Sequence, residues 1–266
     1  GFKTTLEYLT HVCELVVQET DMLPHANPGT MARREMEALQ PFNPSMGLML
    51  ESTSKALYAQ GGPHEFAPSK RPRVRLRTLE LAGQLRVPFT TGILIGIGES
   101  RRDRIESLLA IAELHAQYGH VQEVIIQNFR AKPDTAMGDS PDVETEEFLW
   151  TVAVARLILG PEANLQVPPN LSAKDYQIYL DAGINDWGGV SPLTPDFVNP
   201  EAPWPALTDL KRKTEAAGFD LRPRLPVYPE YFLKTKRFLP DALSLKVSAM
   251  ADAEGYVQGG MQRYAG

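Results

Sequence analysis

Short apolar runs and apolar stripes with helical spacing alternate along the 266-residue chain. Runs bounded by turn residues predict buried strands, and stripes at spacings of three and four predict helices that bury one face. The pattern predicts strands at 22–25, 45–50, 87–95, 121–128, 165–168 and 184–187. It predicts helices at 3–20, 31–39, 74–85, 100–118, 148–159, 176–182 and 206–217.

Regular alternation of strands and helices predicts an α/β fold with a parallel sheet covered by helices. Six strands fit an open sheet, whereas a (β/α)8 TIM-type barrel needs two more. We expect the barrel, with strands 3 to 8 within residues 1–225 and the first two β/α units missing, so that the chain is a fragment of a longer protein. Residues 226–266 are expected to form a C-terminal extension, loosely held over 252–266.

Composition narrows the function classes. The formal net charge is −6, so no basic surface is expected to recruit nucleic acid or an anionic membrane. The sequence has neither an apolar run of about 18 residues nor a signal peptide at its start. One cysteine excludes an internal disulfide and favours a reducing, cytoplasmic setting. The composition therefore predicts a protein that acts on small molecules.

The strand ends supply the candidate chemistry, because barrels of this kind carry their active sites at the carboxyl ends of the strands. Most side chains expected there are polar and neutral. The residues expected at the strand ends are His25, Asn27, Glu51, Gly96 to Glu99, Gln127, Asn128, Arg130, Lys132, Asn170, Asp186 and Trp187. A lining rich in amides suits a substrate with many hydroxyl and imide groups, since each buried polar group needs a partner.

Several of these residues also have structural interpretations. His25 has no second metal ligand near it in sequence and is expected to be a structural hydrogen-bonding residue. Glu51 fits a helix cap equally well. Asp186 and Trp187 fit residues that close the barrel floor. Three arginines are expected to be solvated, with one of them turned inward: Arg73, Arg75 and Arg77.

The run TTGILIGIGES, Thr90 to Ser100, reads as a buried strand that ends in a glycine-rich loop. It resembles the G-x-I-x-G-x-x-E segment that contacts adenine in radical S-adenosylmethionine enzymes, with Leu94 in place of isoleucine. LMLEST, Leu48 to Thr53, resembles their ribose-binding strand, which implies that Glu51 takes the sugar hydroxyls. The cofactor-binding residues expected from this resemblance are Glu51, Arg75, Gly92, Gly96, Gly98 and Glu99.

Longer stretches resemble the 7,8-didemethyl-8-hydroxy-5-deazariboflavin synthases: LPHANPGTM, PSMGLMLEST, VPFTTGILIGIGES, HVQEVIIQNFRAKPDTAM, VPPNL, INDWGGVSPLTPDFVNPEAPWP and VYPEY. The resemblance covers most of residues 1–232. It implies S-adenosylmethionine and a [4Fe-4S] cluster as cofactors. The implied reaction is radical ring closure of a 4-hydroxybenzyl adduct of a ribityl-aminouracil with loss of ammonia, which forms a deazaflavin for coenzyme F-420. It also implies a tyrosine-cleaving radical S-adenosylmethionine partner, as a subunit or a fused domain.

The chain departs from this family in its cysteines. The family holds its cluster with a C-x-x-x-C-x-x-C group, whereas the only cysteine here is Cys13, on a predicted helix. We therefore expect the cluster ligands upstream of residue 1 and expect the chain as given to be inactive. Position alone nominates four residues for the uracil and ribityl groups: Gln127, Asn128, Asn170 and Asp186.

Two alternatives from other classes stay open at this point. One is a lyase or aldolase without a cluster, in which Lys132 forms a Schiff base with a carbonyl substrate. The other is a non-catalytic barrel that binds the adenosyl group and has lost the cluster.

Overall fold

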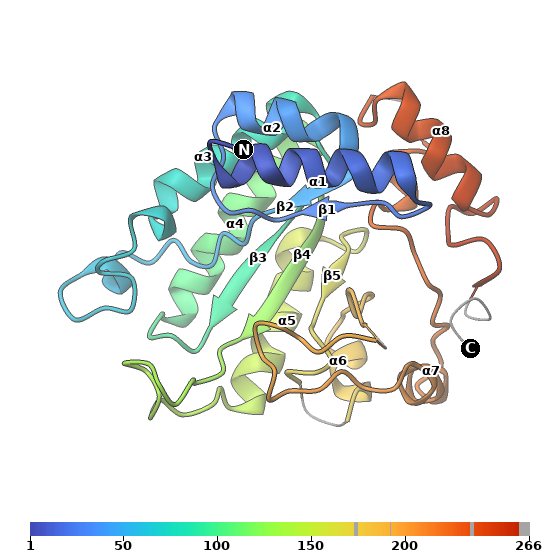
Figure 1. Ribbon diagram of the computed structural model, residues 1–266. Coiled ribbons are helices and arrows are strands. Elements are labelled where there is room, and N and C mark those ends of the chain that lie inside the picture. Colours follow the sequence, from blue (N-terminus) through green and yellow to red (C-terminus); the bar gives the residue numbers. More distant parts are fainter. Residues whose placement is uncertain (173–174, 192, 235–236, 261–266) are drawn as a thin grey trace.

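A parallel sheet forms the centre of the computed structural model, which describes residues 1–172, 175–191, 193–234 and 237–260 (Figure 1). Its strands are β1 (His25–Ala26), β2 (Ser45–Gly47), β3 (Phe89–Ile95), β4 (Val121–Asn128) and β5 (Leu165–Gln166). Their order in the sheet, β1-β2-β3-β4-β5, is their order in the chain. Sequential parallel strands with right-handed crossovers place the connecting helices on one side of the sheet, as in a barrel.

Helices cover the outer face of this sheet, and α3, α4 and α5 lie outside β3, β4 and β5 (Figure 1). The helices are α1 (Thr5–Glu19), α2 (Arg33–Leu39), α3 (Pro72–Leu85), α4 (Arg101–Tyr118), α5 (Thr145–Leu159), α6 (Gln177–Asp181), α7 (Leu207–Ala216) and α8 (Asp241–Met250). Four 3-10 turns accompany them: Gln40–Phe42, Ala56–Tyr58, Pro68–Lys70 and Pro229–Tyr231. None of the helices described is long and apolar enough to cross a membrane.

The main core lies between the sheet and these helices. Its fully buried side chains include Leu79, Phe89, Leu108, Ile111 and Val152. Full burial of one such side chain stabilises the fold by about 1.5–3 kcal/mol. The helical stripes and strand runs that predicted the elements are therefore the surfaces that form this core.

The most periodic elements confirm the sequence predictions. The predicted strand at 121–128 coincides with β4. Ser100 begins α4 with a capping box, in which Asp103 Oδ2 accepts from Ser100 N at 2.8 Å. Gly119 ends the same helix in the left-handed region at φ 67°. The α/β class with a parallel sheet follows the prediction as well.

The predicted strand at 184–187 is wrong. That segment makes one isolated parallel bridge, between Gln166 and Asp186. Gly183 and Gly188 flank it at φ 112° and 73°, so the backbone leaves the extended conformation on both sides. Its neighbour β5 is also short, because Pro168 follows and cannot donate to a ladder.

The C-terminal segment forms a second apolar cluster beside the barrel, with Leu225, Val227, Tyr231, Phe238, Val247 and Val257 buried in it. Lys246 of α8 donates to Val17 O and Thr20 O at the end of α1. The expected looseness of 252–266 is wrong for its first part, because Tyr256 bridges Arg224 and Val257 bridges Ala251. Residues 261–266 lie outside the described residues.

Gly92 explains how closely β3 and β4 approach each other. A Cβ atom on Gly92 would lie 2.1 Å from the carbonyl oxygen of Ile125. We expect Gly92→Ala to lower the free energy of unfolding by about 1 to 3 kcal/mol, because the backbone must shift to relieve the overlap. Urea unfolding followed by circular dichroism measures this change. Gly189→Ala is the control, since Gly189 has open space around it, and equal losses in the two variants would contradict the account.

Candidate functional site

Glu51 is held beside the glycine-rich strand by the backbone. Its N–H donates to Gly92 O at 3.0 Å, and its carbonyl oxygen accepts from Leu94 N at 3.0 Å. Glu51 has a φ of 66°, in the left-handed region. A non-glycine residue there costs about 1–3 kcal/mol, and such residues cluster at functional sites. The structure therefore places the predicted ribose-binding residue next to the predicted adenine-binding strand, and Glu51 does not cap a helix.

Three basic groups surround the Glu51 carboxylate, whose side chain is 9% exposed. Lys70 Nζ lies 2.5 Å from Oε1, and Arg75 Nη2 lies 3.3 Å from the same atom. His64 Nε2 lies 3.4 Å from Oε2. Arg75 is the arginine that turns inward, as the sequence prediction required, and it also donates to Ser69 O at 3.1 Å.

Burial dominates the protonation of the groups around Glu51. It lowers the pKa of His64, and the neighbouring Glu51 charge opposes this shift only in part. It also raises the pKa of Tyr58 to about 12, with Glu51 adding to the shift. His64 is therefore neutral, and Lys70 and Arg75 neutralise the Glu51 carboxylate.

One oxygen of this carboxylate fits a ligand hydroxyl. Glu51 Oε2 and His64 Nδ1 are buried without a hydrogen-bond partner among the described residues. A buried polar atom without a partner costs about 1–3 kcal/mol, which a donor from a ligand would remove. The sugar hydroxyls of S-adenosylmethionine are such donors, so the residues present fit its ribose.

The glycine-rich loop after β3 is organised by Glu99. Its Oε1 accepts from Gly96 N at 2.8 Å, and its Oε2 accepts from Ile97 N at 2.9 Å. Arg104 Nε of α4 donates to Oε1 at 2.8 Å, and the Glu99 side chain is 1% exposed. The Glu99 carboxylate therefore contacts the loop and α4, so a ligand at this loop meets backbone atoms.

Gly96 and Gly98 give the loop its shape, with φ of 93° and 106°. A Cβ atom on Gly96 would lie 2.2 Å from Val143 Cγ2, whereas one on Gly98 would have Leu57 Cδ2 at 3.8 Å as its nearest neighbour. Gly96 is therefore required by conformation and packing, and Gly98 by conformation.

The predicted amide residues follow the next strands. Gln127 lies opposite Leu94 in the β3–β4 register. Asn128 Nδ2 donates to Leu171 O at 2.8 Å, and Asn170 Nδ2 donates to Asp196 Oδ2 at 2.9 Å. The Oδ1 atoms of both asparagines are buried without a partner among the described residues. They can accept hydrogen bonds from imide or hydroxyl donors of a ligand.

Asp186 lies apart from these amides. It lines a cavity of about 1090 Å³, as do His25, Asn27 and Gln166. It accepts from Arg224 Nε at 2.6 Å and from Tyr228 OH at 2.8 Å. Its neighbour Trp187 is buried and donates from Nε1 to Thr214 Oγ1 of α7 at 3.1 Å. These contacts fit the structural interpretation considered above.

His25 also has the structural role expected from the sequence. Its Nδ1 lies 2.7 Å from Ser45 Oγ of β2. Burial and the nearby Arg224 charge lower the pKa of His25 to about 4, so the ring is neutral.

Sequence reasoning missed Glu123, Arg224, Tyr228, His64 and Lys70. Glu123 could have been identified from the sequence, because it is a carboxylate in a predicted strand and lies two residues before Ile125, on the same inward face. The others come from loops and the C-terminal segment, where no periodicity indicates which side chain turns inward.

Cys13 does not fit an iron–sulfur cluster. It is buried on α1, its Sγ lies 3.7 Å from Asn43 Oδ1, and burial raises its pKa, which disfavours a thiolate. The described residues contain no group of three or more His, Cys, Asp and Glu side chains that could hold a metal ion. The residues present therefore fit S-adenosylmethionine and do not fit the cluster.

Lys132 and Arg130 form ion pairs on the loop after β4. Lys132 Nζ donates to Asn199 Oδ1 at 2.9 Å and pairs with Glu201, and Arg130 pairs with Asp142. An amine engaged in an ion pair and a hydrogen bond is not the free nucleophile that a Schiff base requires. The geometry therefore does not favour the Lys132 alternative.

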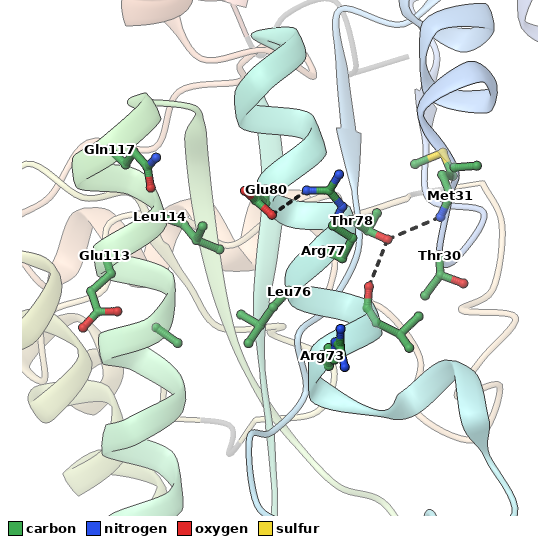
Figure 2. Close-up of a pocket in the computed structure, with 13 residues that line it drawn as sticks. Thr30, Met31, Arg73, Leu76, Arg77, Thr78, Glu80, Glu113, Leu114 and Gln117 are labelled. Atoms are coloured by element: carbon green, nitrogen blue, oxygen red, sulfur yellow. Dashed lines mark hydrogen bonds and ion pairs between the residues drawn. The ribbon is translucent and has the colours of Figure 1, made fainter.

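A second hollow of about 1060 Å³ lies on the outside of the barrel, between α3 and α4 (Figure 2). Arg77 pairs with Glu80 beside it, and Thr78 Oγ1 accepts from Met31 N at 3.4 Å. None of the predicted site residues lines this groove, so it is separate from the site that contains Glu51.

No family model matches the chain. The fold is similar to methylornithine synthase (PylB), with a TM-score of 0.60 at 17% identity, over 81% of this chain and 64% of that one. It is also similar to the FeFe-hydrogenase maturase HydG from Carboxydothermus hydrogenoformans, with a TM-score of 0.62 at 18% identity, over 81% and 52%. The architecture is the TIM-barrel-like α/β fold of radical S-adenosylmethionine enzymes.

The relatives in sequence are more specific. The chain is 53% identical over 258 residues to 7,8-didemethyl-8-hydroxy-5-deazariboflavin synthase of Methanopyrus kandleri, which covers 97% of this chain and 76% of that protein. It is 52% identical over 255 residues to FO synthase of Streptomyces coelicolor, covering 96% of this chain and 29% of that protein. The chain belongs to the 7,8-didemethyl-8-hydroxy-5-deazariboflavin synthase family. FO synthase of Mycobacterium tuberculosis is matched over 30% of its length.

Glu99 provides a test of how the loop is organised. We expect Glu99→Gln to lower the free energy of unfolding by about 3 kcal/mol, because Arg104 then loses a buried charged partner and one loop N–H loses its acceptor. Chemical denaturation at neutral pH measures the loss. Glu106→Gln on the same helix is the control, since the Arg102–Glu106 pair is exposed and screened by solvent. A loss no larger than that of the control would contradict this role.

Proposed function

We propose that this chain supplies the adenosyl-binding and substrate-binding strands of a radical S-adenosylmethionine synthase that closes the deazaflavin ring of FO. The observation that carries the proposal is the 53% identity to the Methanopyrus kandleri synthase over 97% of the chain. Because the chain has one cysteine and spans part of each relative, we assign the cluster ligands to family sequence that these residues do not span.

Bound S-adenosylmethionine would supply, with an electron from the iron–sulfur cluster, the capacity to remove a hydrogen atom from an unactivated C–H bond. Glu51 orients the ribose through Oε2, and Arg75 pairs with Oε1. The backbone from Gly96 to Gly98 receives the adenine, and Glu99 keeps that backbone in place. A buried, fixed site of this kind limits side reactions by excluding water and holding the reacting groups in place.

The substrate in this proposal is a 4-hydroxybenzyl adduct of a ribityl-aminouracil, which loses ammonia on ring closure. Asn128 Oδ1 and Asn170 Oδ1 accept from its imide or ribityl donors, and Gln127 lies beside them at the end of β4. The cavity of about 1090 Å³, which Gln166 and Asp186 line and these asparagines do not, has room for the rest of such a ligand, since small-molecule pockets measure about 300–1,000 Å³.

The partner we propose is the tyrosine-cleaving radical S-adenosylmethionine component that supplies the 4-hydroxybenzyl group. It is supported by the length of the FO synthases, of which this chain spans 29–30%. The acidic composition and single cysteine support a cytoplasmic location.

The reaction is tested with the complete synthase that carries these residues. We expect extracts that contain it and its partner component to form FO, detected by mass spectrometry, from tyrosine and the ribityl-aminouracil. Failure to form FO with reduced cofactor and both components present would overturn the proposal. The same result would favour the barrel that binds the adenosyl group without catalysis.

The adenosyl site is tested by binding. We expect Glu51→Gln to weaken binding of S-adenosylmethionine about tenfold or more, because one hydrogen bond to a charged group contributes about 1.5–3 kcal/mol. Titration calorimetry on the complete protein measures this change. Glu65→Gln is the control, since Glu65 makes an exposed hydrogen bond in the same loop and glutamine keeps an acceptor for Gly61 N. Equal affinities of the two variants would remove Glu51 from the site.

A further inference from the structure

Four side chains on the wall of the 1090 Å³ cavity form a buried polar cluster. Glu123 comes from β4 and Asp186 from the segment after α6, while Arg224 and Tyr228 come from the C-terminal segment. All four line the cavity. Arg224 Nη2 donates to Glu123 Oε1 at 2.8 Å, and its Nε donates to Asp186 Oδ2 at 2.6 Å. The Arg224 guanidinium therefore donates hydrogen bonds to two carboxyl groups.

The Tyr228 hydroxyl contacts two carboxyl groups but has one proton. Two separate hydrogen bonds there need a second proton, which two ionised carboxylates do not have. Its hydroxyl oxygen lies 2.8 Å from Asp186 Oδ2 and 3.1 Å from Glu123 Oε1. A phenol carries one proton, which goes to the closer and ionised Asp186. The remaining contact joins two oxygens, and it is a separate two-centre hydrogen bond only if Glu123 is the donor.

The other oxygen of Glu123 agrees with this assignment. Thr90 Oγ1 donates to Glu123 Oε2 at 3.0 Å and itself accepts from Gln122 Nε2 at 3.2 Å. Oε2 is then the carbonyl oxygen of an acid and Oε1 its hydroxyl oxygen. Every proton in the chain Gln122, Thr90, Glu123, Tyr228 and Asp186 then has one acceptor.

The charges agree as well. With both carboxyls ionised, the cluster would carry one positive and two negative charges in a buried position, which is costly without a second cation. His25, which the Arg224 charge also reaches, has a neutral ring and so supplies no second positive charge. Burial raises the pKa of Glu123 against the opposing effect of Arg224, while Arg224 and Tyr228 hold the pKa of Asp186 below its ordinary value despite burial.

We infer that Glu123 is a neutral carboxylic acid and that Glu123, Tyr228 and Asp186 form a proton store on the wall of the substrate cavity. The inference rests on the proposed function for its chemistry, since a leaving amine must take a proton to depart as ammonia. A basic ligand nitrogen beside Asp186 takes the hydroxyl proton of Tyr228. Tyr228 then takes the carboxyl proton of Glu123. The ligand gains one proton, Glu123 becomes a carboxylate, and solvent later returns the proton.

The protonation state is tested without any assay of activity. We expect the infrared difference spectrum of the 266-residue chain minus its Glu123→Gln variant, at pH 7, to show the C=O stretch of a protonated carboxyl that shifts in D₂O. The matched difference spectrum for Asp186→Asn is expected to show carboxylate bands. Carboxylate bands in the Glu123 spectrum would overturn the inference, whatever the outcome for FO formation.

Stability against pH gives the second test. Because folding raises the pKa of Glu123, the folded chain binds a proton that the unfolded chain has lost above about pH 4.3. The urea midpoint should therefore fall as pH rises through the raised folded pKa. This slope should be weaker in Glu123→Gln, and the midpoint at pH 7 should fall further in Asp186→Asn than in Glu123→Gln. An unchanged slope in Glu123→Gln would contradict the inference.

The role of the proton store is tested in the complete synthase with Tyr228→Phe, which keeps the ring and removes the relay. We expect kcat for ammonia release to fall at least tenfold with little change in KM and with an altered pH profile. Unchanged kcat and pH profile would overturn the proton transfer. The infrared result separates this failure from a failure of the proposed function.

Discussion

The two backbone hydrogen bonds between Glu51 and β3 are the interaction on which the candidate site depends. They hold the chain after β2 against Gly92 and Leu94 and fix the Glu51 backbone at φ 66°. That conformation is costly, and the β2–β3 pairing stabilises it. With Glu51 in place, the ribose acceptor and the adenine loop belong to neighbouring strands, so one ligand can reach both.

The same constraint extends across the sheet. Gly92 lets β4 approach β3 closely, and the resulting register sets Gln127 beside Leu94 and Asn128 beside Ile95. On the wall of the 1090 Å³ cavity, Arg224 links the C-terminal segment to β4 through Glu123. The segment after residue 221 is therefore part of the cavity wall as well as the source of its own apolar cluster.

The sequence predicted the fold where periodicity is strong and the site where a short segment carries the chemistry. β4 and α4 were predicted closely because their apolar spacing and caps are local properties. The strand at 184–187 was mispredicted because flanking glycines, whose φ depends on tertiary context, end it after one bridge. The structure brings the predicted residues Glu51 and Arg75 together. Arg224 and Tyr228 reach the cavity from a segment without periodicity, so only the folded chain reveals their partners.

Glu99 shows a further limit of prediction. The resemblance assigned it to the cofactor, and its carboxylate instead contacts the loop and Arg104, so its effect on a ligand is indirect. The most direct test of the account is a crystal structure of the complete synthase with S-adenosylmethionine bound. The account predicts a ribose hydroxyl within hydrogen-bond distance of Glu51 Oε2 and the adenine on the backbone of Gly96 to Gly98. A ligand bound elsewhere, with Glu51 still contacting only Lys70, Arg75 and His64, would contradict it.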